Sequence, residues 1–301
     1  MVNVLLGAAA LGLLWSILTI GVFITFRILS IPDLTVDSSI VLGAATASVA
    51  IVAGASPYLA TALAMLAGMA AGTLTGLLHT KLHIPALLSG ILSMIALYSV
   101  NIRVMNNAAN ISLLRMRTVF TPFIEMGFTR NMATILKGSI FVILVIAVIY
   151  WFFRTELGNA IRATGCNTAM AKAQGINTDT IKIIGLALGN GLVGLSGALI
   201  AQYLGFTDIM MGPGSIAIGL ASVIIGEVLF GKSHLLRALI AIVLGAVTYR
   251  FIIAFVLEAG MRATDLRLFT AVTVAVALYM PHIKSWLKAR KKWREGGTRN
   301  A

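Results

Sequence analysis

The chain has 301 residues, of which 59% are hydrophobic and only 11% are charged, and its mean hydropathy is +0.97. Soluble globular domains carry about one quarter charged residues, so this composition excludes a soluble enzyme or binding domain and indicates a polytopic membrane protein. We interpret the net charge of +13 as membrane topology and contact with anionic lipid, without nucleic-acid binding. The single cysteine, Cys166, excludes a disulfide within one chain.

Charge-free stretches predict an all-α fold with about nine transmembrane helices, because about 20 apolar helical residues cross the hydrocarbon core. The stretch 38–80 is too long for one crossing, and Gly54, Ser56 and Pro57 divide it. The first span lacks the basic start and cleavage site of a signal peptide, so we expect it to be retained. The predicted spans are 1–26, two within 38–80, 85–102, 135–153, 183–204, 215–230, 235–257 and 268–280.

The positions of Lys and Arg predict the orientation of the chain. The tail at 283–301 is strongly basic, and basic residues concentrate in cytoplasmic segments. We therefore expect a multi-pass protein of the cytoplasmic membrane with its C-terminus inside and its N-terminus outside. The longest polar segments are an external loop at about 103–133 and an internal loop at about 154–182. No soluble domain interrupts the chain, so residues 1–301 are expected to form one transmembrane domain.

Two segments, Asp33–Gly43 and Asp208–Gly219, resemble one another, and each leads into a short apolar span. In the predicted topology the two spans run in opposite directions, which indicates inverted-repeat halves. Short spans after such breaks mark the central site of many transporters, although chance similarity between small-residue helices explains the match equally well. For Asp37 the simplest interpretation is the N-cap of its own span, and a place on the solute pathway is the alternative.

The internal loop contains a short helix with its own start and stop signals. Asn167 is a good N-cap, Thr168–Gln174 favours a helix, and Gly175 can take the left-handed C-terminal position. The helix surface is small apart from Met170, a projecting side chain that suits insertion into a groove on a partner. An ordinary amphipathic loop helix is the alternative.

This loop and the spans around it resemble the permeases of ribose-type and branched-chain amino-acid-type ABC importers. The family pattern of Leu-Gly, Arg-Ala-x-Gly-x-Asn, a short helix, Gly-Ile-Asn and a Gly-rich span is met by Leu157-Gly158, 162–167, 175–177 and 191–197. The segment 31–37 is similar to the family's Gly-Ile-Asp-Leu-Ser-Val-Gly, although Asp37 stands where the family usually has glycine.

The resemblance implies the permease subunit of an ATP-driven importer for a small organic solute. ATP would be hydrolysed by a separate cytoplasmic ATP-binding subunit, so the chain itself is not expected to be an enzyme. A second permease subunit, expected to be a second copy of this chain, and an extracytoplasmic solute-binding protein are also implied, without cofactor or metal. A secondary transporter or channel is the alternative, but few ion-coupling carboxylates lie in the predicted spans. The implied ATPase-coupling residues are Arg162, Gly165, Asn167, Met170 and Gly175.

Polar residues within the predicted spans or just before them add candidates for the solute pathway, since such residues usually face a cavity or a partner. Arg250 could bind a carboxylate through two hydrogen bonds, which fits an amino-acid solute. Snorkelling to the membrane surface, or a pair with Asp208, Glu258 or Asp265, explains it equally well. The stretch 189–191 could loosen its helix, although close packing is the simpler explanation. The predicted pathway residues are Asp33, Asp37, Asn190, Tyr249 and Arg250.

The external loop is rich in arginine, against the usual excess of basic residues inside. We predict that Arg115 and Arg117 form a docking surface for acidic residues of the solute-binding protein. An amphipathic interfacial helix over 111–128 is the alternative. At the other side, Glu227 could pair with Lys232 or Arg237 or face the ATPase. The four histidines are scattered and predict no metal site.

Overall fold

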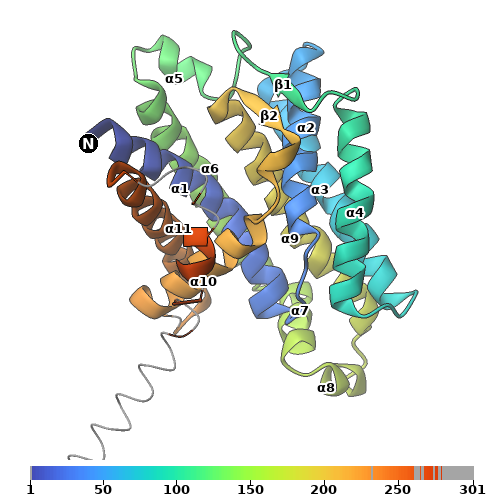
Figure 1. Cartoon of the computed structure of the whole chain (residues 1–301). Coiled ribbons are helices and arrows are strands. Elements are labelled where there is room, and N and C mark those ends of the chain that lie inside the picture. The colour runs from blue at the N-terminus through green and yellow to red at the C-terminus, as the bar shows by residue number, and fades with distance from the viewer. Residues whose placement is uncertain are drawn as a thin grey trace, which may run out of the picture.

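The computed structural model describes residues 2–231, 233–260, 265, 268–273, 275, 276 and 279. The predicted ninth span at 268–280 is described only in part, and the basic tail at 283–301 lies outside the described residues. The described chain is a bundle of long helices with short loops, strands and helices at its two ends (Figure 1). This architecture confirms the all-α polytopic prediction.

Seven described helices are long and apolar enough to cross a membrane, and α2 is a shorter apolar helix. Every span predicted before residue 258 coincides with one of them. The break predicted at Gly54 to Pro57 is present, where Ser56 caps α3 by accepting a hydrogen bond from the Leu59 N–H. In chain order the elements are α1 (Val2–Val22), the π-helix η1 (Phe23–Ile28), α2 (Val36–Val52), α3 (Pro57–Thr80), α4 (Ala86–Val104), β1 (Asn110–Ser112), α5 (Thr121–Glu125), α6 (Arg130–Phe152), α7 (Glu156–Cys166), α8 (Thr168–Ala173), α9 (Thr178–Leu204), β2 (Phe206–Asp208), the 3-10 helix η2 (Ile209–Met211), α10 (Ser215–Phe230) and α11 (Leu235–Glu258).

Helix α9 forms the centre of the bundle, packed against α1, α2 and α3. Glycines on the facing helices allow unusually close backbone contact with α9, because a Cβ on Gly43 of α2 would overlap the carbonyl oxygen of Gly194. A Cβ on Gly68 of α3 would likewise overlap the carbonyl oxygen of Asn190. Since α9 is continuous through residues 189–191, its small residues serve packing and do not break the helix.

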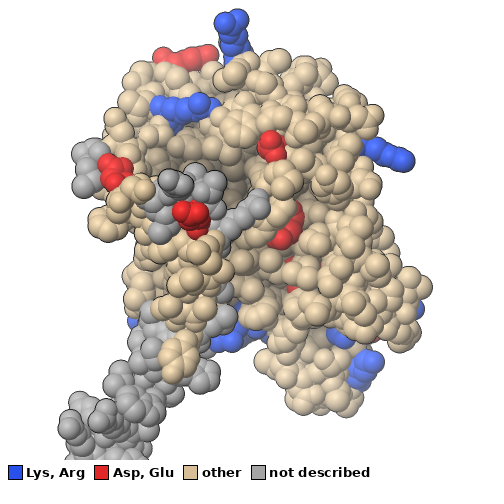
Figure 2. All heavy atoms as spheres, viewed as in Figure 1, with Lys and Arg blue, Asp and Glu red and all other residues tan. Residues whose placement is uncertain are grey.

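The two long polar loops lie at opposite ends of the bundle (Figure 1). At one end β1 pairs antiparallel with β2, and α5 lies at the same end (Figure 1), packed against α6. The interfacial helix considered over 111–128 is not formed: this segment holds the end of β1, turns and the five-residue α5, because Leu113, Val119 and Phe120 are buried against the bundle. At the other end lie α7 and α8. Figure 2 shows Lys and Arg toward the two ends of one face, with mostly uncharged residues between.

Candidate functional site

The loop between α6 and α9 folds into two short helices that meet at a corner. The carboxamide oxygen of Asn167 accepts a hydrogen bond from the Met170 N–H at 3.0 Å and so caps α8, and Gly175 has a φ of +79°. The predicted capped helix is thus confirmed. Sequence reasoning missed α7, although its start is marked by Thr155, whose hydroxyl accepts from the Gly158 N–H.

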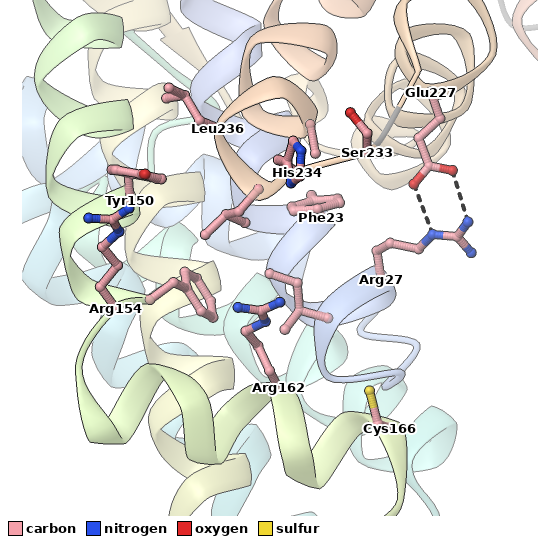
Figure 3. A pocket seen from close by; sticks show the side chains of 14 residues that line it. Phe23, Arg27, Tyr150, Arg154, Arg162, Cys166, Glu227, Ser233, His234 and Leu236 are labelled. Carbon is pink, nitrogen blue, oxygen red and sulfur yellow. Dashed lines mark hydrogen bonds and ion pairs between the residues drawn. The ribbon is translucent and has the colours of Figure 1, made fainter.

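The predicted coupling residues do not all occupy one surface. Met170 is 50% exposed on α8 and projects away from the bundle. Gly165 instead packs against the end of η1, where a Cβ would overlap the carbonyl oxygen of Ile28. Arg162, one turn earlier on α7, points into a groove beside η1 (Figure 3). The corner therefore combines one exposed side chain, Met170, with close packing of Gly165 against the end of the first span.

A buried polar network lies where the chain enters α2. The Asp33 carboxylate, on a residue only 2% exposed, accepts hydrogen bonds from the Asn190 side-chain amide at 2.5 Å and from the Thr35 N–H at 3.0 Å. The Ser39 hydroxyl donates to the carboxamide oxygen of Asn190 at 2.7 Å. The structure therefore brings together two of the predicted pathway residues, Asp33 and Asn190, through direct contact between the entry to α2 and the middle of α9.

Asp37 does not cap its own helix. The N-cap of α2 is Thr35, which makes no side-chain capping bond. The Asp37 carboxylate instead accepts hydrogen bonds from the Gly214 N–H at 3.0 Å and the Ile216 N–H at 2.8 Å, at the start of α10. The N-cap interpretation was wrong because the first-turn side chain reaches across to the second helix break, where unpaired N–H groups attract an anion.

Helices α2 and α10 run in opposite directions from this contact. The far part of α2 lies beside β2, where the Ser48 and Thr207 hydroxyls are hydrogen bonded at 2.5 Å. The far part of α10 lies beside η1, where Glu227 forms a two-point ion pair with Arg27, with both N···O distances 2.9 Å. The two resembling sequence segments thus meet at their breaks, although the sequence did not indicate Arg27 as the partner of Glu227.

Further polar side chains surround the start of α2 and were missed by sequence reasoning. The Thr75 hydroxyl contacts those of Thr35 and Ser93 at 2.7 and 2.8 Å. The Asn101 amide donates to the Ser38 carbonyl oxygen, and its own side-chain oxygen is buried without a hydrogen-bond partner in the described part of the chain. Single hydroxyl and amide groups in apolar helices give no periodic signal, so only the fold groups them.

Tyr249 and Arg250 form a separate cluster on α11, which packs against α1 and α10. The Arg250 guanidinium lies over the Trp15 ring, 4.3 Å from the ring centroid, and the Tyr249 hydroxyl is hydrogen bonded to that of Thr270. Asp208, one partner considered for Arg250, instead accepts from the Met210 N–H and the Asn110 amide. The structure does not bring this cluster together with Asp33 and Asn190.

Arg115 and Arg117 are exposed on the loop between β1 and α5. The loop is anchored on the end of α9, since the Leu113 N–H donates to the Gly205 carbonyl oxygen at 2.8 Å and the Val119 N–H donates to the side-chain oxygen of Gln202 at 3.0 Å. The two arginines therefore lie on a loop whose backbone is held to the end of α9 by hydrogen bonds. Within the part of the chain that the structure describes, no three His, Cys, Asp or Glu side chains gather as metal ligands.

Comparison with known proteins gives the class of this bundle. Residues 4–279 match the family model of the permease component of branched-chain amino acid transport systems. The chain belongs to this family, so it is a membrane permease of an ABC-type import system.

Individual relatives agree with this assignment. A tyrosine transport system permease protein of Clostridioides difficile is 39% identical over 92% of this chain and 91% of its own length. An uncharacterized protein of Rickettsia prowazekii is 30% identical over 92% of this chain and 97% of its own length. An autoinducer 2 import system permease protein of Escherichia coli is 31% identical over 36% of this chain and 31% of its own length. No solved structure matches the chain.

Proposed function

We propose that this chain forms the membrane pathway of an importer for an amino acid, driven by a separate cytoplasmic ATPase and supplied by an extracytoplasmic solute-binding protein. The observation that carries the proposal is the meeting of two oppositely directed helix breaks through Asp37, beside the buried Asp33–Asn190 pair. In transporters built from inverted repeats, such breaks form the solute site. The relative named for tyrosine transport supports an amino acid as the solute.

The chemistry of this region suits a zwitterion. The Asp37 carboxylate is partly exposed and can meet an ammonium group, while the positive ends of α2 and α10 can hold a solute carboxylate that takes the place of Asp33 or Asp37 on their N–H groups. Asp33, Asp37 and Asn190 are therefore our main pathway candidates. Arg250 and Tyr249 are secondary ones, because Trp15 already covers one face of the guanidinium.

The end of the molecule with α7 and α8 is placed in the cytoplasm in this proposal, and the end with β1 and β2 outside. Met170, Asn167 and Gly175 then present α8 to the ATPase, while Gly165 and Arg162 join α7 to the bundle. Two copies of the chain would enclose one pathway, with the helix breaks at α2 and α10 of each copy facing the solute. Arg115 and Arg117 would face acidic residues of the binding protein.

The direct test is transport in vesicles. The permease is reconstituted with its cognate ATPase and binding protein, and uptake of labelled tyrosine is followed with and without ATP. We expect uptake only when the ATPase and ATP are present. Uptake that persists without the ATPase, driven by an ion gradient, would show a secondary transporter and overturn the proposal.

A point substitution tests the coupling surface separately. Met170→Glu places a charge on the exposed knob, which should weaken ATPase association about tenfold or more, because desolvating an unpaired charge in an interface is costly. Glu156→Gln, an exposed position at the start of α7, is the matched control and should bind normally. Association is measured by co-purification and by titration of the ATPase. Unchanged binding by Met170→Glu would remove α8 from the docking surface.

A further inference from the structure

A groove of about 690 Å³ opens at the end of the bundle that carries α7 and α8 (Figure 3). Its walls come from η1, the last turn of α6, α7 and the turn between α10 and α11. One side of the groove is apolar and the other carries basic side chains. The apolar lining comprises Phe23, Ile28, Tyr150, Phe153, Leu235 and Leu236.

The basic side carries charge that no other described side chain neutralises. In Figure 3, Arg162 points toward the middle of the groove, and Arg154 lies along the Tyr150 ring with its guanidinium carbon 4.8 Å from the ring centroid. Neither arginine forms an ion pair or a hydrogen bond with another described side chain. The groove's acidic residue, Glu227, is held by Arg27 through the two-point ion pair, so its charge is balanced and does not repel an anion.

The groove lies at the level where membrane spans end. Helix α6 and η1 end beside it, and α11 begins there at Leu235. No side chain caps the start of α11, so the N–H groups of its first turn also favour a bound anion. Leu236, which lines the groove, is 41% exposed, and Trp151 in the last turn of α6 is 69% exposed. Exposed large apolar residues next to unpaired arginines are typical of a surface that meets the membrane interface.

We propose that this groove binds the phosphate headgroup of an anionic phospholipid, with Arg154 and Arg162 as the phosphate ligands. The lipid's glycerol and upper acyl chains pack on the apolar side. A free phosphate ion would leave most of the volume and the whole apolar side unused. The choice of a lipid rests on the proposed orientation, which puts the groove in the negatively charged cytoplasmic leaflet.

The test uses the purified full-length chain in detergent, without the ATPase. The protein is mixed with micelles containing phosphatidylglycerol or phosphatidylcholine, and retained lipid is counted by native mass spectrometry. We expect the wild-type chain to retain phosphatidylglycerol preferentially. An arginine near a membrane surface contributes about a fivefold preference for anionic lipid, so the double variant Arg154→Gln and Arg162→Gln should lose about 25-fold in apparent affinity.

Controls separate lipid binding from misfolding and from simple charge. The double variant Arg154→Lys and Arg162→Lys keeps both charges and should retain most of the binding. Lys172→Gln removes a charge from α8, outside the groove, and should bind lipid normally. The proposal is overturned if the glutamine double variant retains phosphatidylglycerol like the wild type, if phosphatidylcholine is retained equally well, or if inorganic phosphate displaces the lipid at similar concentration. Because ATPase association is measured separately with Met170→Glu, failure of either proposal is visible without the other.

Discussion

The helix-break site and the α7–α8 corner are built in opposite ways. At the breaks, Asp33 is 2% exposed and shares hydrogen bonds with residues from distant parts of the chain, while α2 contacts α9 through glycine. At the corner, Met170 is 50% exposed and α8 is defined by a cap three residues away. Substitutions at the breaks should therefore change folding and transport together, whereas those at the corner should change one partner interaction and leave the bundle intact.

The largest effect is expected from Gly43→Ala. The added methyl group would overlap the Gly194 carbonyl oxygen, and because backbone meets backbone, no side chain can move aside. Overpacking of this kind costs about 3 kcal/mol, so the yield of monodisperse protein and the thermal unfolding temperature should both fall. Gly7→Ala is the matched control, since the nearest side-chain atoms are 3.7 and 3.8 Å from the new Cβ. Equal stability of the two variants would contradict the close α2–α9 contact.

Asp37→Asn should have the next largest effect. Hydrogen bonds to a charged acceptor contribute about 1.5–3 kcal/mol each; the carboxylate accepts two of them from the start of α10, and asparagine keeps an acceptor oxygen for one. We expect lower thermal stability and a larger loss of tyrosine uptake, with ATPase association kept. Glu125→Gln, which neutralises an exposed acid on α5, serves as the control. If Asp37→Asn transports normally, the helix breaks do not form the pathway.

Asn167→Ala should have a moderate effect confined to the corner. Loss of an N-cap costs about 1 kcal/mol, which loosens α8 and should weaken ATPase binding about fivefold without lowering the stability of the bundle. Asn159→Ala removes an exposed amide from the interior of α7 and should leave binding unchanged. A fall in bundle stability with Asn167→Ala would show that the corner is not independent of the helix-break region.

The smallest effect is expected at the loop between β1 and α5. Neutralising Arg115 and Arg117 together with glutamine should weaken binding of the solute-binding protein by about 0.5 kcal/mol per charge at low salt, and by less as ionic strength rises. Surface plasmon resonance across a salt series measures this directly. Lys172→Gln, at the opposite end of the bundle, should have no influence. A variant that binds like the wild type at every salt concentration would rule out charge-guided docking.

The sequence predicted what depends on local patterns. Charge-free length placed the spans before residue 258, and Asn167 and Gly175 marked the ends of α8, because capping and hydropathy act within a few residues. The partners of Asp37 and Glu227 were not predictable in this way. Gly214 and Arg27 lie far from them in the chain, and only packing of the helices decides which polar groups meet.

Asp33 and Asn190 show an intermediate case. Asp33 was a candidate because it lies at the break before a short span, and Asn190 because its glycine-rich stretch could loosen a helix, yet nothing in the pattern joined them. Arg250 was predicted as an ionisable group within a span and lies instead against Trp15. Residue type therefore identified which polar groups were candidates for the pathway. Only the three-dimensional contacts decided which of them belong to the same site.

The pairing of β1 with β2 has a mechanical consequence. Ile111 pairs with Thr207, and the chain continues from β2 through η2 directly into α10, whose first turn holds Asp37. A force on the loop that follows β1 would therefore act on the same short stretch of backbone that leads into α10. In the proposed orientation, docking of the solute-binding protein at this loop would act on the helix breaks at the middle of the bundle through the few residues between β2 and α10.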